Sequence, residues 1–309
     1  MGSTIMAGDG MAGTTAVIGL GSMGHGMAQS LLRAGFAVAG YDPAPGVAES
    51  LAAEGGRAAA SPADAARDAA VVVAVVVNAD QTEAVLFGPD GCADAMAPDA
   101  VFVSCATMAP DRARSLAARL EASGRHYLDA PMSGGAARAA EGSLTMLASG
   151  SAAAFARAEP ALAAMTGTLY RLGDTAGQGA AFKMVNQLLA GVHIAAACEA
   201  MAFAKREGLD LGRVFDVITR SAGNSWMFEN RVPHILEGDY APKSAVEIFV
   251  KDLGIVVDMA RASRFPVPVA GAALQMFLMT AAAGMGRDDD ASVARLYGRI
   301  AGLDLPGQD

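Results

Sequence analysis

The chain has 309 residues, of which 53% are hydrophobic and 18% are charged, and its formal net charge is −9. This length is sufficient for two domains with large cores, and an acidic chain without a basic stripe is not expected to bind nucleic acid. Cys92, Cys105 and Cys198 are too widely spaced for a disulfide framework or a metal site. We therefore expect a cytoplasmic protein that holds no metal.

The amino-terminal residues 1–13 lack the basic start and the apolar stretch of a signal peptide, and we expect them to form a mobile tail. The apolar run 69–77 is half the length of a membrane span and is rich in β-branched residues. It therefore indicates a buried parallel strand, and no association with a membrane is expected.

A strand, a glycine-rich turn and a helix follow one another from residue 15. The turn is G-x-G-x-x-G, in which Gly19 permits the tight bend, Gly21 lets the backbone approach a pyrophosphate, and Gly24 lets helix and strand pack closely. An anion bound there would lie at the helix N-terminus. The pattern predicts a dinucleotide site, with a glycine turn that binds nothing as the alternative. Its predicted residues are Gly19, Leu20, Gly21, Ser22, Met23 and Gly24.

A second apolar strand, residues 36–41, ends at the acidic residue Asp42. A carboxylate at this position accepts hydrogen bonds from ribose hydroxyls and repels a 2′-phosphate. Pro43 and Ala44 follow, with no cation to neutralise such a phosphate, so NAD is favoured over NADP. Arg57, further along, is the residue that would complicate this preference.

Alternating apolar and helical segments continue through the first half, with further strands predicted at 70–77, 100–105, 126–130, 143–149 and 167–172. This pattern predicts an α/β fold with a mostly parallel, doubly wound Rossmann-type sheet over residues 14–176. From residue 177 the pattern becomes all-helical to residue 309, beginning with a long helix at 180–206 that joins the two domains. Further helices are predicted near 210–221, 226–237, 244–263, 267–284 and 289–300. A long helix in an apolar domain also suggests a homo-oligomer.

Ligands of doubly wound sheets bind outside the carboxyl ends of the strands. Val77 and Asn78 stand at the end of strand 70–77, and Thr107 follows strand 100–105, so cofactor contacts are predicted for all three. For Asn78 and Thr107, capping of the next helix is an equally good interpretation.

A proline-flanked, glycine-rich turn follows strand 126–130. In it, Ser133 with the amides of Gly134 and Gly135 can form a nest for a substrate carboxylate. A tight turn that binds no ligand fits the sequence equally well.

Lys183 is the best candidate for the group that takes a proton from a substrate hydroxyl, because it stands in the first turn of an otherwise apolar helix. Burial beside a nicotinamide would lower the pKa of its amine. Asn186 and Gln187 lie three and four residues further on, hence on nearly the same face, and His193 continues that face. The alternative is a lysine whose amine reaches solvent at a domain edge.

Two candidates lie in the helical domain. Asn224 stands among other amides near Trp226, the single tryptophan of the chain. Lys251 interrupts an apolar run beside Asp252, where a lysine either reaches a ligand or makes a surface ion pair.

Taken together and in this order, these segments resemble the β-hydroxyacid dehydrogenase family, which includes 3-hydroxyisobutyrate and tartronate semialdehyde reductases. The resemblance extends from Thr15 to about Leu303. Its motifs here are Gly19-Leu-Gly-Ser-Met-Gly24, Asp129-Ala-Pro-Met-Ser-Gly-Gly135, Gly179-Ala-Ala-Phe-Lys183-Met-Val-Asn186 and Lys251-Asp-Leu253. The resemblance implies a fold like that of 6-phosphogluconate dehydrogenase and Lys183 as the catalytic acid/base. It also implies Ser133 and its glycines at the substrate, and Thr107 and Lys251 near the cofactor.

Within the family, the run from Ser133 to Gly142 and the run from Ala222 to Arg231 resemble a branch that oxidises the four-carbon sugar acid L-threonate. This implies NAD-dependent oxidation of the C2 hydroxyl to a 2-oxo acid. A polyol acid also needs further hydrogen-bonding groups, for which Asn186, His193, Asn224 and Ser225 are the candidates. Many relatives carry two asparagines after the lysine, whereas this chain has Asn186 and Gln187. This difference affects the predicted identity of the substrate more than the predicted reaction.

Two other functions remain as alternatives. One is the oxidation or reduction of another small acid, such as 3-hydroxyisobutyrate or tartronate semialdehyde. The other is a catalytically silent nucleotide-binding scaffold, against which the presence of Lys183 argues, since silent relatives lose that lysine.

Overall fold

The structure, a computed structural model, describes residues 12–307. It divides into two compact units, the first ending at Lys183 and the second beginning at Met184. The division lies inside a long helix, whereas the sequence analysis placed the boundary before that helix. The tail expected over residues 1–13 lies outside the described residues except for Ala12 and Gly13, which already belong to the first strand.

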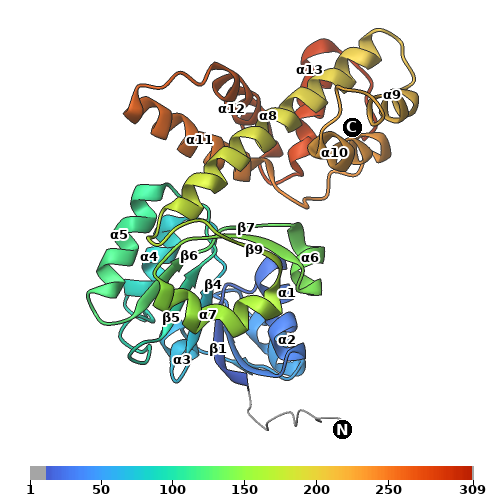
Figure 1. Cartoon of the computed structure of the whole chain (residues 1–309). Helices are drawn as coiled ribbons and strands as arrows, with labels where there is room; N and C mark the ends of the chain where they lie inside the picture. Colours follow the sequence, from blue (N-terminus) through green and yellow to red (C-terminus); the bar gives the residue numbers. More distant parts are fainter. Residues whose placement is uncertain (1–11, 308–309) are drawn as a thin grey trace, which may run out of the picture. The chain divides into compact units, whose positions relative to one another are not determined.

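The first unit is built on a six-stranded sheet of order β3-β2-β1-β4-β5-β6, in which every neighbouring pair is parallel (Figure 1). This is the doubly wound arrangement that the alternating pattern predicts. The strands are β1 (Ala12–Ile18), β2 (Phe36–Tyr41), β3 (Arg57–Ala58), β4 (Val71–Ala74), β5 (Val101–Ser104) and β6 (His126–Asp129). The two-residue strand β3 was not predicted, because it is too short to show a periodicity.

Helices cover both faces of this sheet because successive strand residues point to opposite sides. Val71 and Val73 pack into a core with helices α1 and α7, whereas Val72 and Ala74 pack into a second core with α3, α4 and α5. Strands buried on both faces are continuously apolar, as β4 and β5 are. The helices are α1 (Ser22–Arg33), α2 (Val47–Ala53), α3 (Pro62–Ala66), α4 (Ala79–Phe87), α5 (Pro110–Glu121) and α7 (Ala152–Met165).

The strands expected at 143–149 and 167–172 do not extend the main sheet. They are β8 (Leu144–Ala148) and β9 (Thr166–Arg171), which form a separate three-stranded sheet with β7 (Met132–Ser133). β7 is antiparallel to β8, and β8 is parallel to β9. Alternate residues of β8 are buried, which is typical of a strand that covers a core with one face, so these strands lack the two buried faces of β4. Helix α6 (Gly135–Glu141) connects β7 to β8.

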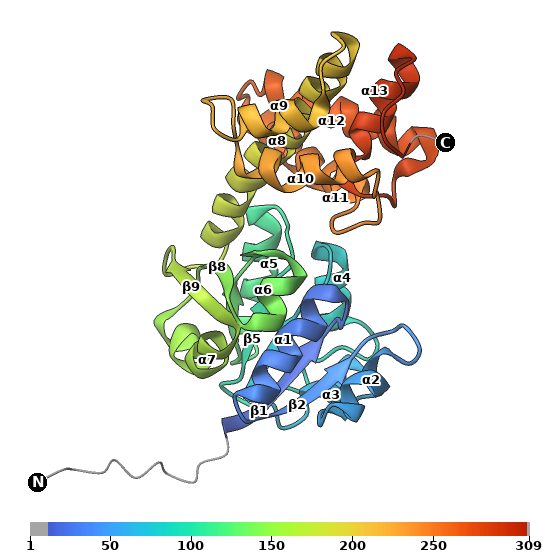
Figure 2. The same cartoon turned by 90° about the vertical axis from the view of Figure 1, so that its right-hand side faces the viewer.

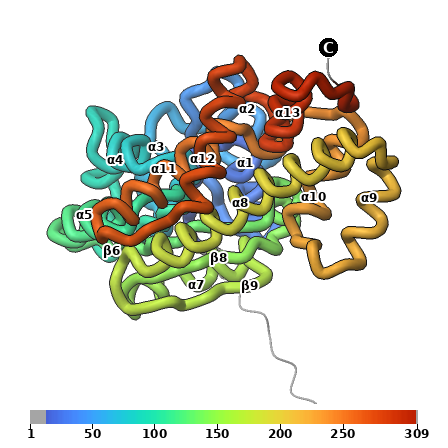
Figure 3. Tube along the Cα trace, turned by 90° about the horizontal axis from the view of Figure 1, so that it is seen from above, coloured from blue at the N-terminus to red at the C-terminus, as the bar shows by residue number. Residues whose placement is uncertain are grey.

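The second unit is helical, and its longest helix is α8 (Gln178–Arg206), which begins in the first unit. A Cβ on Gly191 would lie 2.9 Å from Leu253 Cδ1 and 3.0 Å from Phe249 Cδ1, so this glycine lets α8 and α11 approach closely. Helices α9 and α10 lie beside the carboxyl-terminal half of α8 (Figures 2 and 3). The other helices are α9 (Leu211–Ile218), α10 (Trp226–Glu237), α11 (Val246–Ser263), α12 (Pro268–Thr280) and α13 (Val293–Ala301).

Two of the helices predicted for this unit are interrupted. The helix expected at 267–284 ends as an α-helix at Thr280 and continues as one π-helical turn, Ala281–Met285, in which Gly284 has a φ of +89°. The helix expected at 289–300 starts as a short 3-10 turn, Asp290–Ser292. Asp290 is fully buried and forms an ion pair with Arg231 of α10, which fixes the chain at this turn.

Candidate active site

The glycine turn joins β1 to α1, and each glycine has the steric environment that the motif requires. Gly19 has a φ of +90°, and a Cβ there would lie 2.4 Å from the oxygen of Val75. A Cβ on Gly24 would lie 1.8 Å from the oxygen of Gly19. A Cβ on Gly21 would meet no atom within 4 Å. Gly19 and Gly24 are therefore needed by the turn itself, whereas the space beside Gly21 is open to a ligand.

The amino end of α1 has the features of an anion site. Gly21 is its N-cap residue, no side chain caps it, and its first turn carries no acidic residue. The first amides of a helix without a cap present hydrogen-bond donors and the positive end of the helix dipole. Together with the open space at Gly21, this end fits the pyrophosphate of a dinucleotide.

Asp42 lies directly beside this turn. Its Oδ2 accepts a hydrogen bond of 2.8 Å from Leu20 N, and its Oδ1 accepts one of 2.9 Å from Ala44 N. The carboxylate is thus held at the carboxyl end of β2, next to the glycine turn. Arg57, the cation that would favour NADP, pairs with Asp64 at 3.1 Å.

Asn78 follows β4 and Thr107 follows β5, and only one of them caps the next helix. Asn78 is the N-cap of α4, and its Oδ1 accepts a hydrogen bond of 2.9 Å from Gln81 N. Val77 N donates to Gln81 Oε1 at 2.8 Å. The capping interpretation therefore holds for Asn78. It is wrong for Thr107, because the N-cap of α5 is Ala109 and no side chain caps that helix.

The turn after β7 brings a residue to the site that the sequence analysis did not select. Gly134 and Gly135 have φ values of +141° and +77°, which glycine adopts more readily than other residues. A Cβ on Gly134 would lie 2.9 Å from Arg138 Cδ, so the stem of Arg138 lies over this glycine. Its position four residues after Gly134, in the last turn of the short helix α6 (Gly135–Glu141), is the signal that would have pointed to it.

Lys183 is buried, with 7% of its surface exposed, and its Nζ donates a hydrogen bond of 2.9 Å to the oxygen of Met132. Met132 is the residue before Ser133, so the lysine lies at the predicted carboxylate turn. The alternative of an amine reaching solvent at a domain edge is wrong. Within the first unit, the structure thus joins two motifs that the sequence analysis could only place separately.

A chain of polar side chains in the second unit includes two further candidates. Asn186 Nδ2 donates to Gln187 Oε1 at 3.0 Å, and Gln187 Nε2 donates to Asp252 Oδ2 at 2.5 Å. Lys251 Nζ pairs with the other oxygen of Asp252 at 2.7 Å. Lys251 therefore does make an ion pair, but with a fully buried partner rather than at the surface. The side chain of Gln187 is long enough to make this hydrogen bond with Asp252.

Asn224, in contrast, is held by its own loop. Its Nδ2 donates to the oxygen of Thr219 at 3.2 Å and to Glu229 Oε1 at 2.5 Å. Its Oδ1 is buried and has no hydrogen-bond partner in the described part of the chain.

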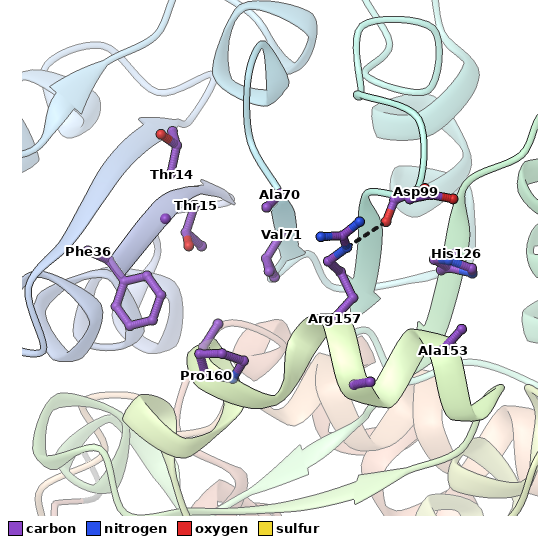
Figure 4. A pocket seen from close by; sticks show the side chains of 13 residues that line it. Thr14, Thr15, Phe36, Ala70, Val71, Asp99, His126, Ala153, Arg157 and Pro160 are labelled. Carbon is purple, nitrogen blue, oxygen red and sulfur yellow. Dashed lines mark hydrogen bonds between the residues drawn. The ribbon is translucent and has the colours of Figure 1, made fainter. Parts of the chain in front are cut away.

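A pocket of about 520 Å³ in the first unit lies elsewhere. It is lined by Thr15, Phe36, Val71 and His126, at or near the amino ends of four strands, and by Arg157 of α7 (Figure 4). Ligands of doubly wound sheets bind at the opposite, carboxyl end. This pocket is therefore not the predicted site.

A dinucleotide turn on a doubly wound sheet, followed by a helical unit and a buried lysine, defines an NAD-dependent hydroxyacid dehydrogenase. The profile of the NAD binding domain of 6-phosphogluconate dehydrogenase matches residues 14–173, and the profile for NAD-binding of NADP-dependent 3-hydroxyisobutyrate dehydrogenase matches residues 177–297. The chain belongs to the β-hydroxyacid dehydrogenase family.

Two relatives and one crystal structure are similar to this chain over nearly its whole length. It is 56% identical to the L-threonate dehydrogenase of Cupriavidus necator, over 94% of this chain and 97% of the relative. It is 47% identical to the L-threonate dehydrogenase of Pectobacterium atrosepticum, over 94% and 95%. The crystal structure of a 3-hydroxyisobutyrate dehydrogenase from Salmonella typhimurium superposes with a TM-score of 0.87 at 50% identity, covering 92% of this chain and 99% of the other.

Proposed function

We propose that this protein oxidises the C2 hydroxyl of L-threonate to the 2-oxo acid with NAD, and that Lys183 is its acid/base. The observation that carries the proposal is the hydrogen bond from Lys183 Nζ to Met132, beside the turn at Ser133. The substrate is supported by the two relatives named L-threonate dehydrogenase, which are 56% and 47% identical over nearly the whole chain.

When bound, NAD accepts the hydride that leaves the substrate carbon. The amino end of α1 and the turn from Gly19 to Gly24 bind the pyrophosphate. Asp42 accepts hydrogen bonds from the ribose hydroxyls, and its negative charge disfavours the 2′-phosphate of NADP. The remaining cofactor contacts are assigned to Val77, Asn78, Thr107 and Lys251.

The substrate carboxylate binds to the amides of Gly134 and Gly135 and to the hydroxyl of Ser133. The stem of Arg138 packs on Gly134, and this arginine contributes a positive charge for the carboxylate. Asn186 and Asn224 bind the remaining hydroxyls, for which the unpaired Oδ1 of Asn224 offers an acceptor.

Lys183 receives the proton of the C2 hydroxyl on its neutral amine, directly or through one water molecule. As the hydride leaves, the new ammonium lies beside the developing carbonyl oxygen and stabilises its negative charge. Its hydrogen bond to the Met132 oxygen holds the nitrogen in place beside the turn at Ser133. The proton later returns to solvent.

The test is the rate of NADH formation by the wild-type protein and by Lys183→Ala, with L-threonate, D-threonate, D-erythronate, 3-hydroxyisobutyrate and D-glycerate offered separately. We expect turnover with L-threonate, and a loss of at least about 100-fold in kcat on removing the amine. NAD affinity, measured by calorimetry, should stay within about 3-fold, because no part of the pyrophosphate site is altered.

The same assay separates the alternatives. Turnover on 3-hydroxyisobutyrate in place of L-threonate would agree with the name of the Salmonella typhimurium structure and would keep the role of Lys183 while replacing the substrate. NAD binding without turnover on any of the acids would favour the silent scaffold.

We further propose that the protein is a cytoplasmic homo-oligomer, dimeric or tetrameric, without nucleic-acid or membrane partners. Val185, Leu189 and Phe203 lie along one face of α8 and are 62%, 49% and 65% exposed, which suits burial against a second subunit. Two segments among the described residues, Gln178–Arg206 and Pro268–Met285, are long and apolar enough to cross a membrane, and 50% and 28% of their apolar windows are buried inside the protein. Sedimentation analysis tests the oligomer.

A further inference from the structure

Asp129, the last residue of β6, is a fully buried carboxylate to which the proposed mechanism gives no role. Its main chain forms a two-way bridge with Ser149, in which Asp129 N donates to Ser149 O at 3.0 Å and Ser149 N donates to Asp129 O at 2.8 Å. The backbone at Asp129 is therefore fixed both by β6 and by the segment that follows β8.

The carboxylate of Asp129 binds the amino end of α8. Its Oδ2 accepts hydrogen bonds from Gly177 N at 2.9 Å and Ala180 N at 2.8 Å, and from Ser149 Oγ at 3.3 Å. Ser149 Oγ in turn accepts a hydrogen bond of 2.9 Å from Gly179 N. Two side chains thus satisfy three amides at the start of the helix that carries Lys183.

The helix is also in direct steric contact with this support. A Cβ on Gly179 would lie 2.2 Å from the oxygen of Leu147 and 3.0 Å from the oxygen of Asp129, so only glycine allows the helix to approach this far. The steric contact prevents the first turn of α8 from moving toward the small sheet. The hydrogen bonds to Asp129 and Ser149 prevent it from moving away.

Lys183 forms a second link between the two segments that Asp129 joins. Ala180 is three residues before Lys183, and Asp129 is three residues before Met132, whose oxygen accepts the hydrogen bond from Lys183 Nζ. The same two short segments are therefore joined twice, once at Asp129 and once at the amine. A lysine side chain has four rotatable bonds, so its nitrogen keeps one place only if both the helix and its acceptor are held.

We propose that Asp129, with Ser149, is a positioning residue for Lys183: the carboxylate fixes the first turn of α8 so that the amine stays beside the turn at Ser133. This inference rests on the proposed function, since it assigns Asp129 an effect only through the lysine. A charged acceptor suits the task because hydrogen bonds to a carboxylate are stronger than neutral ones, and because negative charge is favoured at a helix N-terminus.

The test is a double-mutant cycle on kcat with the full-length protein, using Asp129→Ala, Lys183→Ala and the double variant. In the wild-type background we expect Asp129→Ala to lower kcat about 100-fold, as a displacement of about 1 Å can do. In the Lys183→Ala background we expect no further loss of the residual turnover, because the residue through which Asp129 acts is gone. NAD affinity should be unchanged in all three variants, within about 3-fold.

Two further variants keep the test decisive if Asp129→Ala does not fold. Asp129→Asn keeps an acceptor oxygen without the charge, and Ser149→Ala removes only the contacts with Gly179 and the carboxylate. Each is expected to lower kcat about 10-fold in the wild-type background and to have no effect in the Lys183→Ala background. Ser151→Ala is the matched control, because it removes the serine cap of α7 instead, and it should lower thermal stability without changing kcat.

Equal losses in both backgrounds would overturn the proposal, as would folded variants of Asp129 and Ser149 that keep wild-type kcat. These results are distinguishable from a failure of the proposed function, in which Lys183→Ala itself would retain wild-type turnover. That last result would overturn both.

Discussion

The amine of Lys183 donates a hydrogen bond of 2.9 Å to the main-chain oxygen of Met132, which lies 51 residues earlier in the chain. This contact brings a buried amine to a turn whose glycines have positive φ values and whose serine precedes a helix. The proposed proton acceptor and the proposed carboxylate-binding turn therefore lie together within the first unit.

Asp42 is expected to determine the choice of cofactor. Asp42→Ala removes the acceptor for the ribose and the contact with Leu20 N, whereas Asp42→Asn removes the charge and keeps an acceptor. A hydrogen bond to a charged group contributes about 1.5–3 kcal/mol, so we expect the KM for NAD to rise at least about 10-fold in the alanine variant. Steady-state rates with NAD and NADP check this. A ratio of the two cofactors that stays unchanged in both variants would contradict it.

Gly21 and Gly24 are expected to differ sharply when changed to alanine. A Cβ on Gly24 would collide with the oxygen of Gly19 at 1.8 Å, so Gly24→Ala should destabilise the first unit. Gly21 has a φ of −60° and free space, so Gly21→Ala should keep its melting temperature while its Cβ occupies the place of the pyrophosphate. We expect NAD affinity to fall at least about 10-fold in Gly21→Ala. Thermal unfolding and calorimetry measure the two effects, and normal NAD binding by Gly21→Ala would place the phosphates elsewhere.

Arg138 is expected to bind the carboxylate of the substrate. Arg138→Gln removes the charge while keeping most of the stem that packs on Gly134, so we expect the KM for the acid to rise about 10-fold with little change in kcat or in the KM for NAD. Arg157→Gln serves as the control, because Arg157 lines the pocket at the other end of the sheet. A loss in kcat alone would argue for a different role of Arg138.

Stability is expected to change with pH through two buried carboxylates. Burial raises the pKa of Asp129 and of Asp290 from 3.8 to about 6, although backbone hydrogen bonds and Arg114 act against this at Asp129, and Arg231 acts against it at Asp290. Each group therefore binds more protons in the folded than in the unfolded chain between pH 4 and 6. Its contribution to stability rises as the pH falls through this window, by at most about 1.4 kcal/mol per pH unit. Urea unfolding at pH 4, 5, 6 and 7 measures the slope. Asp129→Asn should reduce it, and an unchanged slope would mean that Asp129 does not titrate there.

The ion pair between Arg231 and Asp290 is expected to matter most when only one partner is removed. Arg231 is 8% exposed, and its Nε lies 2.6 Å from Asp290 Oδ1. Arg231→Ala leaves a buried carboxylate without its cation, which should cost about 3–5 kcal/mol of unfolding free energy. The double variant with Asp290→Ala should be more stable than Arg231→Ala alone. Chemical denaturation of the three variants checks this order, and additive losses would show that the two side chains are not coupled.

The sequence by itself determined the features that depend on local pattern. The strand, glycine turn and helix from β1 to α1 follow from residue types at adjacent positions, because a tight bend and a close helix approach each require glycine at one fixed place. The alternating apolar runs determined the doubly wound sheet, since strands buried on both faces must be continuously apolar. The position of Asp42 beside the glycine turn could be predicted because its place after β2 is fixed by the same local geometry.

The tertiary structure decided which distant segments meet. The small sheet of β7, β8 and β9 was not predicted. Pairing between strands depends on which partner buries the same face, and the residues of a short strand do not show which strand that partner is. Three contacts of the proposed site likewise depend on tertiary structure. Lys183 donates a hydrogen bond to Met132, Arg138 packs on Gly134, and Asp129 accepts hydrogen bonds from the start of α8. Hydrogen bonds and van der Waals contacts act over a few ångströms in space, whereas a sequence pattern reports only neighbours along the chain.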